Sequence, residues 1–386
     1  MRELYSSLLT FIFLLCIYNV KAQKDSSEVT FNGQATSWGV MQFEKPSGSL
    51  LGLRFVPTLL GKFTLNNHSK VDFEASLNIS GNIGFSDLKY DTVTGQFKPY
   101  RVWARYSGQN WEIRAGLQKI NFGTAKMFRP LMWFDGMDIR DPLQLTDGVY
   151  GALARYYFQN NANIWFWTLI GNDKPKGFET MGTSTWKPEI GGRVQVPAGP
   201  GEIAISTNHR KINYLNLSSI GDFSEKFINE SRIGLDGKWD LGIGLWFESS
   251  ITFTEKSDMN LPVYQDAWNL GADYTIPLGN GLGTTVEYFR YHAGEKFFTE
   301  GNTVNIVGSM FTYPVTILDN ISAMFFYVPG PDLLMNYLSW SRTYDNWNLY
   351  AIGFWNPTDF RIMSVQSQSK NLFSGKGIQL MVNYNF

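Results

Sequence analysis

Apolar and polar side chains alternate without a break along residues 70–80, which read "KVDFEASLNIS". One face of this stretch carries Val71, Phe73, Ala75, Leu77 and Ile79, and the other carries Lys70, Asp72, Glu74, Ser76, Asn78 and Ser80. A period of two indicates a β-strand whose two faces meet different environments. The stretch therefore predicts a strand with one apolar and one polar side.

The same alternation recurs between Val29 and Phe386. The clearest further stretches are residues 99–108, 111–119, 202–210, 231–240, 242–254, 266–276 and 282–290. Each is close to the ~9–11 residues that a tilted strand needs to cross a bilayer. Alternation is weaker in 148–158, 303–313 and 319–328. We count about 18 strands, with 16 as the alternative.

The connections between these stretches alternate between short and long. The long connections are expected at about residues 81–96, 121–147, 171–187, 211–229, 255–264, 293–302 and 356–374. This alternation is typical of a transmembrane antiparallel β-barrel, with tight turns on the periplasmic side and loops outside. A soluble β-sandwich or propeller would not sort its connections in this way. The predicted fold class is therefore all-β, a transmembrane barrel.

The first residues, "MRELYSSLLTFIFLLCIYNVKAQ", predict a secretory signal peptide over 1–22, cleaved after Ala22. Arg2 precedes an apolar run that is too short to span the ~30 Å of a bilayer core. The remaining residues, 23–386, show no internal repeat or linker and predict a single barrel domain. Cys16 is the only cysteine, so disulfides do not hold the mature chain together.

Composition supports a membrane sheet. Aromatic residues make up 16% of the chain, and its formal net charge is −1. A near-neutral balance argues against nucleic acid as a partner. Seven aromatic residues flank the short turns and predict an interfacial girdle: Tyr106, Trp111, Tyr157, Phe158, Trp239, Tyr344 and Trp347.

The chain ends with another alternating stretch, in which Ile378, Leu380, Val382, Tyr384 and Phe386 share one face. We expect this last strand to close the barrel against the first, near residues 29–40. A terminal aromatic at Tyr384 and Phe386 resembles the sorting signal that the outer-membrane assembly machinery recognises in Gram-negative barrels. The expected location is the outer membrane of a Gram-negative bacterium, and the expected partners are this machinery, outer-membrane lipid and lipopolysaccharide.

If the apolar face touches lipid, the polar face lines the lumen. Its basic part is expected to hold Arg101, Trp103, Arg105, Glu112, Arg114, Gln118, Arg155, Arg193, Arg210 and Arg232. An acidic part is expected to hold Asp236, Glu248, Asp273 and Glu287. Opposed walls of this kind would set up a transverse field that filters solutes by charge and dipole. The alternative is that the charges pair and plug the barrel, although a lumen of this size exceeds what side chains fill.

Residues 120–148 interrupt the strand pattern. The segment is too long and too aromatic for a solvated loop, so we expect it to fold inward or to cap the mouth. Its charged residues Arg129, Asp135, Asp138 and Arg140 are expected to belong to the constriction. The aspartates, with Asp141, are also candidate calcium ligands, but pairing with the two arginines is favoured.

This segment carries a family resemblance. "GLQKINFG" (116–123), Pro130, "DGMDIRDP" (135–142) and "LTDGV" (145–149) resemble the element "GRQ-x-INWG…DP" of uncharacterised Bacteroidota outer-membrane proteins. They are also loosely similar to porins of the alginate-export type. The likeness covers roughly 35 residues, and Leu117 and Phe122 depart from the pattern. It implies an arginine-rich lumen that passes an anionic polysaccharide, with Arg101, Arg105 and Arg114 in that role.

Catalytic chemistry has little support. The three histidines form no HExxH motif, and the chain has no phosphate-binding glycine loop and no paired cysteines, so we expect neither an enzyme nor a cofactor or metal. A lipid-acting enzyme at His209 or His292 is the minor alternative.

The predicted function is a porin-like channel for passive diffusion of small polar or anionic solutes. A non-conducting surface protein that binds a glycan or partner through its loops is the main alternative, and an export channel for an anionic polysaccharide is a less favoured one. Trp103 and Trp246 face inward and are candidates for stacking on sugars within a channel. Nothing in the sequence indicates the oligomeric state.

Overall fold

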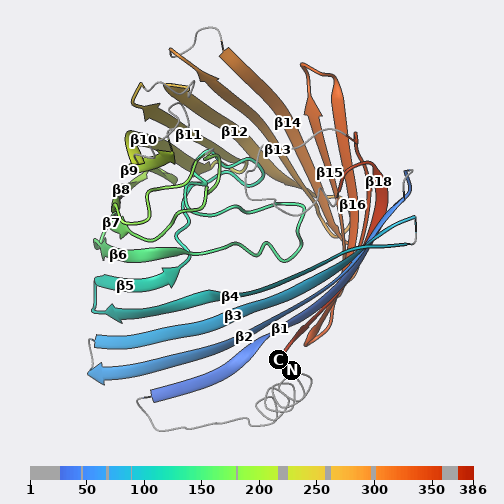
Figure 1. The fold of residues 1–386 in the computed structure, drawn as a ribbon, viewed down its shortest axis with the longest axis horizontal. Coiled ribbons are helices and arrows are strands. Elements are labelled where there is room, and N and C mark those ends of the chain that lie inside the picture. The colour runs from blue at the N-terminus through green and yellow to red at the C-terminus, as the bar shows by residue number, and fades with distance from the viewer. Residues whose placement is uncertain are drawn as a thin grey trace.

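The described residues form one closed antiparallel sheet of 18 strands (Figure 1). The computed structural model describes residues 27–44, 47–66, 69–87, 89–179, 181–215, 225–256, 262–296, 301–358 and 373–386. Each strand pairs with its neighbours in the chain, and β1 pairs with both β2 and β18, so the sheet closes on itself. The predicted signal peptide, with Cys16, lies outside the described residues.

The strands follow one another around the barrel in chain order. They are β1 (Ser27–Gln42), β2 (Gly48–Asn66), β3 (Ser69–Ser86), β4 (Lys89–Ser107), β5 (Trp111–Gln118), β6 (Val149–Tyr157), β7 (Asn163–Leu169), β8 (Glu189–Ala198), β9 (Gly201–Leu215), β10 (Glu225–Asp240), β11 (Gly244–Thr254), β12 (Tyr264–Ile276), β13 (Leu282–Gly294), β14 (Gly301–Pro314), β15 (Asp319–Val328), β16 (Leu333–Thr343), β17 (Trp347–Trp355) and β18 (Lys376–Asn385).

The strand count of 18 is confirmed, because the three stretches with weak alternation are strands β6, β14 and β15. The long loop expected at 81–96 is wrong. Strands β3 and β4 run through this region, since β3 ends at Ser86 and β4 begins at Lys89. The stretch holds three Gly and two Asp, which is typical of loops, but a register irregularity at Gly84 and Phe85 accommodates it within the β3–β4 ladder. The loop expected at 211–229 is shorter than predicted, since β9 reaches Leu215 and β10 begins at Glu225.

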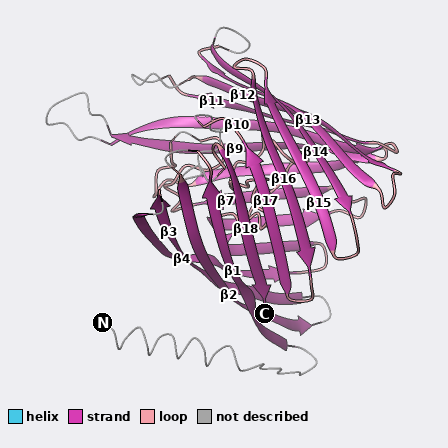
Figure 2. Ribbon diagram, turned by 90° about the vertical axis from the view of Figure 1, so that its right-hand side faces the viewer, coloured by secondary structure: helices cyan, strands magenta, loops and turns pink. Residues whose placement is uncertain are grey.

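The outer face of the barrel is apolar, and much of its inner wall carries polar and charged side chains. Leu270 is 60% exposed and Leu380 57%, whereas Gln118 and Glu287 are completely buried. This is the inverse of a soluble protein and the pattern of a barrel whose outer face meets lipid. The regular secondary structure of the described residues consists of β-strands (Figure 2). Among these residues, no helix is long and apolar enough to span a membrane.

The last residue completes the closure. Phe386 and Gly33 exchange backbone hydrogen bonds of 3.0 and 3.1 Å, which extend the β1–β18 ladder by one step. The ring of Phe386 stacks on Phe55 with centroids 5.6 Å apart. Gly33 is required there, because a Cβ atom would lie 2.8 Å from the ring of Phe386 and 2.4 Å from the carbonyl of Val56. The predicted pairing of the last strand with the first is confirmed.

The aromatic residues near the short turns lie mainly on the outer face. Tyr106 packs edge-on against Trp111, with ring centroids 5.2 Å apart. Tyr157 differs from the prediction, because its hydroxyl bonds to the carboxylate of Glu112 at 3.3 Å on the inner side. Its neighbour Tyr156 is 45% exposed on the outer face and takes the expected interfacial place.

An apolar core lies within the barrel. Met127 and Phe128, from the connection between β5 and β6, pack with apolar residues such as Phe289 and Phe326 on the inner faces of β12–β17. A second cluster joins Phe122 and neighbouring residues of the same connection to β6 and β7. The connection therefore folds into the lumen, where it has a core of its own.

Candidate functional site: the lumenal segment

Residues 119–148, called here the lumenal segment, leave the wall between β5 and β6 and cross the interior (Figure 1). Of the two expectations for this region, folding inward and capping the mouth, the structure shows the first. Its central residues are nearly inaccessible, with Ile120 and Leu131 both 1% exposed. The segment reaches strands β11–β13, which lie on the far side of the closed sheet.

Glu248 on β11 holds the first contact point. One carboxylate oxygen accepts the backbone N–H groups of Thr124 and Ala125 at 2.8 and 2.9 Å. The other oxygen accepts the N–H of Leu131 at 2.6 Å. Because the segment has no ladder partner here, this one carboxylate satisfies three backbone donors that would otherwise be buried without a partner.

Glu287 on β13 repeats the arrangement. It accepts the backbone N–H of Lys126 at 2.6 Å on one oxygen. Its second oxygen accepts those of Met127 and Phe128 at 3.0 and 2.8 Å. Asn269 on β12 donates to the same oxygen and to the carbonyl of Phe128. The segment is thus fixed to the far wall by two carboxylates, which we call the anchors.

Side chains add further contacts. The ammonium of Lys126 forms an ion pair with Asp273 and lies 5.1 Å from the ring centroid of Trp246. Trp133 donates its indole N–H to the hydroxyl of Ser250 at 2.9 Å. Glu248, Asp273 and Glu287, expected as an acidic wall facing water, therefore serve to hold the segment.

The segment also pairs its own charges. Arg129 lies 3.4 Å from Asp135 and donates to the carbonyl of Phe122. Arg140 lies 2.6 Å from Asp138. These are the pairs favoured by the sequence over calcium binding. No cluster of three or more His, Cys, Asp or Glu side chains suited to a metal occurs in the described part of the chain.

Most arginines on the inner wall are neutralised by a nearby carboxylate. Arg105 pairs with Asp72 at 2.5 Å and with Glu112 at 2.9 Å. Arg155 also pairs with Glu112, at 3.0 Å. Farther round, Arg193 forms two hydrogen bonds with Asp236, of 2.6 and 2.8 Å. The expected division into a basic wall and an opposing acidic wall is therefore wrong for these residues.

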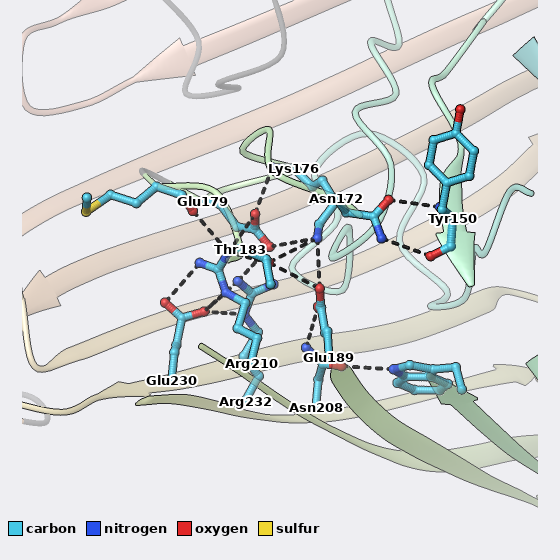
Figure 3. A network of polar contacts seen from close by, with 12 residues as sticks. Tyr150, Asn172, Lys176, Glu179, Thr183, Glu189, Asn208, Arg210, Glu230 and Arg232 are labelled. Carbon is cyan, nitrogen blue, oxygen red and sulfur yellow. Dashed lines mark hydrogen bonds and ion pairs between the residues drawn. The ribbon is translucent and has the colours of Figure 1, made fainter. Parts of the chain in front are cut away.

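A larger network lies where β9 and β10 meet residues 176–189 (Figure 3). Arg210 pairs with Glu230 at 2.6 Å and with Glu179 at 2.9 Å. Arg232 reaches the same two carboxylates at 2.6 and 2.8 Å. Beside them Lys176 pairs with Glu189 at 2.9 Å. All these side chains are buried, and positive and negative charges balance within the cluster.

Three arginines form no ion pair with a carboxylate among the described residues: Arg54, Arg101 and Arg114. They lie on the inner faces of β2, β4 and β5, and we call them the arginine strip. Arg101 donates to the carbonyls of Tyr100 and Thr146. Arg114 donates to the side chain of Gln118 and to the carbonyl of Lys119.

Arg54 was missed by the sequence analysis because its strand reads as an almost continuous apolar run, "LLGLRFVPTLLG", which hides the alternation. Its guanidinium lies 5.2 Å from the ring centroid of Trp38, and its Nε atom has no hydrogen-bond partner in the described structure. Burial raises the pKa of Asp141 in the lumenal segment, and the nearby charge of Arg54 acts in the opposite direction. Arg54 and Asp141 therefore lie within electrostatic reach across the space between wall and segment.

The other predicted residues lie beside the strip. Trp103 donates its indole N–H to Glu74 at 3.0 Å. The guanidinium groups of Arg105 and Arg114 lie 5.8 and 5.3 Å from its ring centroid, so the ring is occupied by cations. Gln118 is fully buried and donates to the carbonyl of Gly151.

Two histidines bear on the enzyme alternative. His209 projects from the outer face of β9 and its Nδ1 lies 2.9 Å from the hydroxyl of Ser231 on β10. In the described residues no carboxylate contacts the ring of His209, so no acid orients this pair. His292 instead forms a buried contact of 2.8 Å with Asp266. His68 lies outside the described residues.

The fold was compared with known protein families, curated proteins and solved structures. No family model matches the chain, and no curated protein matches it. Among solved structures, the outer-membrane protein OmpT of Vibrio cholerae matches with a TM-score of 0.54 and 11% identity, covering 94% of this chain and 100% of that one. OccAB4 of Acinetobacter baumannii also scores 0.54, with 9% identity and coverage of 95% and 100%. OmpF of Salmonella typhi, in complex with daunomycin, scores 0.50, with 10% identity and coverage of 96% and 99%.

The chain has the fold of a porin-type outer-membrane β-barrel. The likeness extends over nearly the whole chain at very low identity, so the shared property is the fold. An apolar outer belt and a closed sheet suit a bilayer, and barrels of this type lie in the outer membrane of Gram-negative bacteria.

Proposed function

We propose that this protein is an outer-membrane channel for passive diffusion of small polar or anionic solutes. The observation that carries the proposal is a closed barrel of 18 strands whose polar inner face is crossed by a segment fixed to the far wall. Such a segment would narrow the lumen and leave part of its cross-section open. Solutes would pass along the wall of β2–β5, which carries the arginine strip.

The arginine strip supports a preference for anions. Its three guanidinium groups lie on adjacent parts of one wall and lack the carboxylate partners that neutralise Arg105, Arg155 and Arg193. Guanidinium groups offer a fixed fork of donors to carboxylate and phosphate oxygens. A run of such groups raises the local anion concentration in a confined aqueous space. The constriction would comprise the strip, Trp103, Gln118 and the charged residues of the lumenal segment.

The rest of the proposal concerns surroundings. The barrel-assembly machinery would recognise Tyr384 and Phe386. The apolar outer face of the barrel would contact membrane lipid and lipopolysaccharide. A mature single-domain chain would begin at residue 23 after removal of the leader. Catalysis is not part of the proposal, because the exposed pair of His209 and Ser231 has no orienting acid in the described structure.

The experiment is conductance of the purified protein in planar lipid bilayers, with swelling of liposomes in sugars of graded size as the second measurement. A channel gives discrete conductance steps and swelling that declines with solute size. A protein that folds into the barrel but gives neither signal would be the non-conducting surface protein, and the proposal would be wrong. Release of a long anionic polysaccharide from loaded liposomes would favour the export channel.

A further inference from the structure

A recess lies between the lumenal segment and the wall formed by β10–β13, on the side of the long connections. About 440 Å³ of space not occupied by protein atoms lies within it, a volume that includes open solvent. Its apolar lining comes from Pro130, Met132 and Trp133 of the segment, Phe178, and the wall residues Ala267 and Tyr291. None of these residues belongs to the arginine strip.

The charged part of the lining is already neutral. Glu179, Glu230, Asp266 and Arg232 border the recess, and Asp266 pairs with Arg290 at 2.7 Å. Arg232 bonds to both glutamates, and Arg210 behind it bonds to the same two. The three carboxylates are therefore balanced by the guanidinium groups of Arg210, Arg232 and Arg290, so the recess offers no net charge to attract an anion or a cation.

Three polar groups in the recess have hydrogen-bonding capacity that the protein does not use. Tyr291 donates its hydroxyl to the side-chain oxygen of Gln265 at 3.0 Å, and the Gln265 amide nitrogen has no hydrogen-bond partner among the described residues. The hydroxyl of Thr252 and the Nη1 atom of Arg232 also make no hydrogen bond in the described part of the chain. None of these three groups is a buried unsatisfied atom, so each can reach solvent or a solute.

From this combination we infer that the recess is a binding site for a neutral, polyhydroxylated solute of the size of a monosaccharide. Spare amide, hydroxyl and guanidinium donors match sugar hydroxyls, and the rings and aliphatic groups match the apolar C–H face of a sugar. The charge balance disfavours charged solutes. Because the recess is open on one side, a bound sugar keeps part of its hydration, and affinity is weak, as a site on a diffusion route requires.

The test is equilibrium binding to the full-length mature protein in detergent, followed by saturation-transfer NMR. The probes are glucose, galactose and N-acetylglucosamine, with glucuronate as the charged counterpart of glucose. We expect binding of neutral sugars in the millimolar range, with glucuronate no tighter than glucose. Gln265→Ala is expected to weaken binding about threefold to tenfold, and Thr252→Tyr, which fills the recess, to abolish it.

Gln195→Ala is the matched control, because Gln195 lies on β8 and bonds to Glu202 outside the recess. It is expected to bind sugars as the wild type does. Absence of saturable sugar binding to the wild type, or binding that is unchanged in both recess variants, would overturn the inference. Tighter binding of glucuronate would also overturn it. Binding in detergent needs no conduction, so failure of this inference is distinct from failure of the proposed channel.

Discussion

The carboxylate of Glu287 on β13 accepts the backbone N–H of Phe128 at 2.8 Å, although Phe128 belongs to the segment that leaves the sheet between β5 and β6. Glu287 is completely buried and serves two further backbone donors. A buried carboxylate is costly unless its oxygens are hydrogen-bonded, and here the segment supplies the donors. The contact therefore both stabilises the charge and fixes the position of the segment in the lumen.

The anchors can be tested by truncation. Glu287→Ala leaves the N–H groups of Lys126, Met127 and Phe128 without their acceptor. We expect a loss on the order of 3 kcal/mol in the free energy of unfolding, measured by urea titration in detergent. We also expect faster proteolysis within residues 119–148 and a larger single-channel conductance, because the segment is released from the wall.

A conservative variant and a control variant test this prediction further. Glu287→Gln keeps one amide oxygen as an acceptor and is expected to show a smaller loss than the alanine variant. Glu202→Ala removes an exposed carboxylate that bonds to Gln195 near a short turn, and should leave conductance and proteolysis unchanged. Equal conductance in Glu287→Ala and wild type would show that the segment does not depend on this anchor.

Asp141 gives a prediction about selectivity. Its carboxylate lies within electrostatic reach of Arg54 and opposes the positive field of the strip. Asp141→Asn is expected to raise the preference for anions, measured as a shift of the reversal potential in a salt gradient. Asp332→Asn, in an exposed turn between β15 and β16, is the control and should leave the potential unchanged. A shift toward cations in Asp141→Asn would contradict the assignment.

The end of the chain gives a prediction about assembly. Phe386→Ala removes ring contacts with Phe55 and Phe31, each worth about 1 kcal/mol. We expect slower assembly and a lower fraction of folded barrel, measured by heat-modifiable migration of the protein on gels. Phe97→Ala, which removes a 70% exposed ring from β4, is the control. Normal assembly of Phe386→Ala would show that the terminal ring is dispensable.

The barrel could be predicted from the sequence because alternation depends only on the residues of each strand. The period of two at residues 70–80 and 378–386 was enough to assign the faces, and the closing pair of strands follows from it. The sequence also indicated that residues 120–148 fold inward or cap the mouth, because apolar residues such as Phe122, Phe128 and Trp133 do not suit a solvated loop.

The partners of the charges could not be predicted in the same way. That Arg193 meets Asp236, or that Glu248 meets the backbone of Ala125, depends on register around the ring and on a path through the lumen. The alternation along a strand predicts the face on which a charged side chain lies, but it does not predict which residue that side chain contacts. The prediction of a transverse field was wrong for this reason. Arg105, Arg155 and Arg193 form ion pairs with nearby carboxylates, so they do not face an acidic wall across the lumen. Arg54 was missed because an apolar run concealed its phase.

The account depends most directly on the arginine strip, and the reversal potential in a salt gradient tests it. Wild-type channels should prefer anions. The triple variant Arg54→Ala, Arg101→Ala and Arg114→Ala should lose that preference, and the matching triple lysine variant should keep most of it because the charge is retained. An unchanged anion preference in the triple alanine variant, with the barrel folded and conducting, would contradict the account.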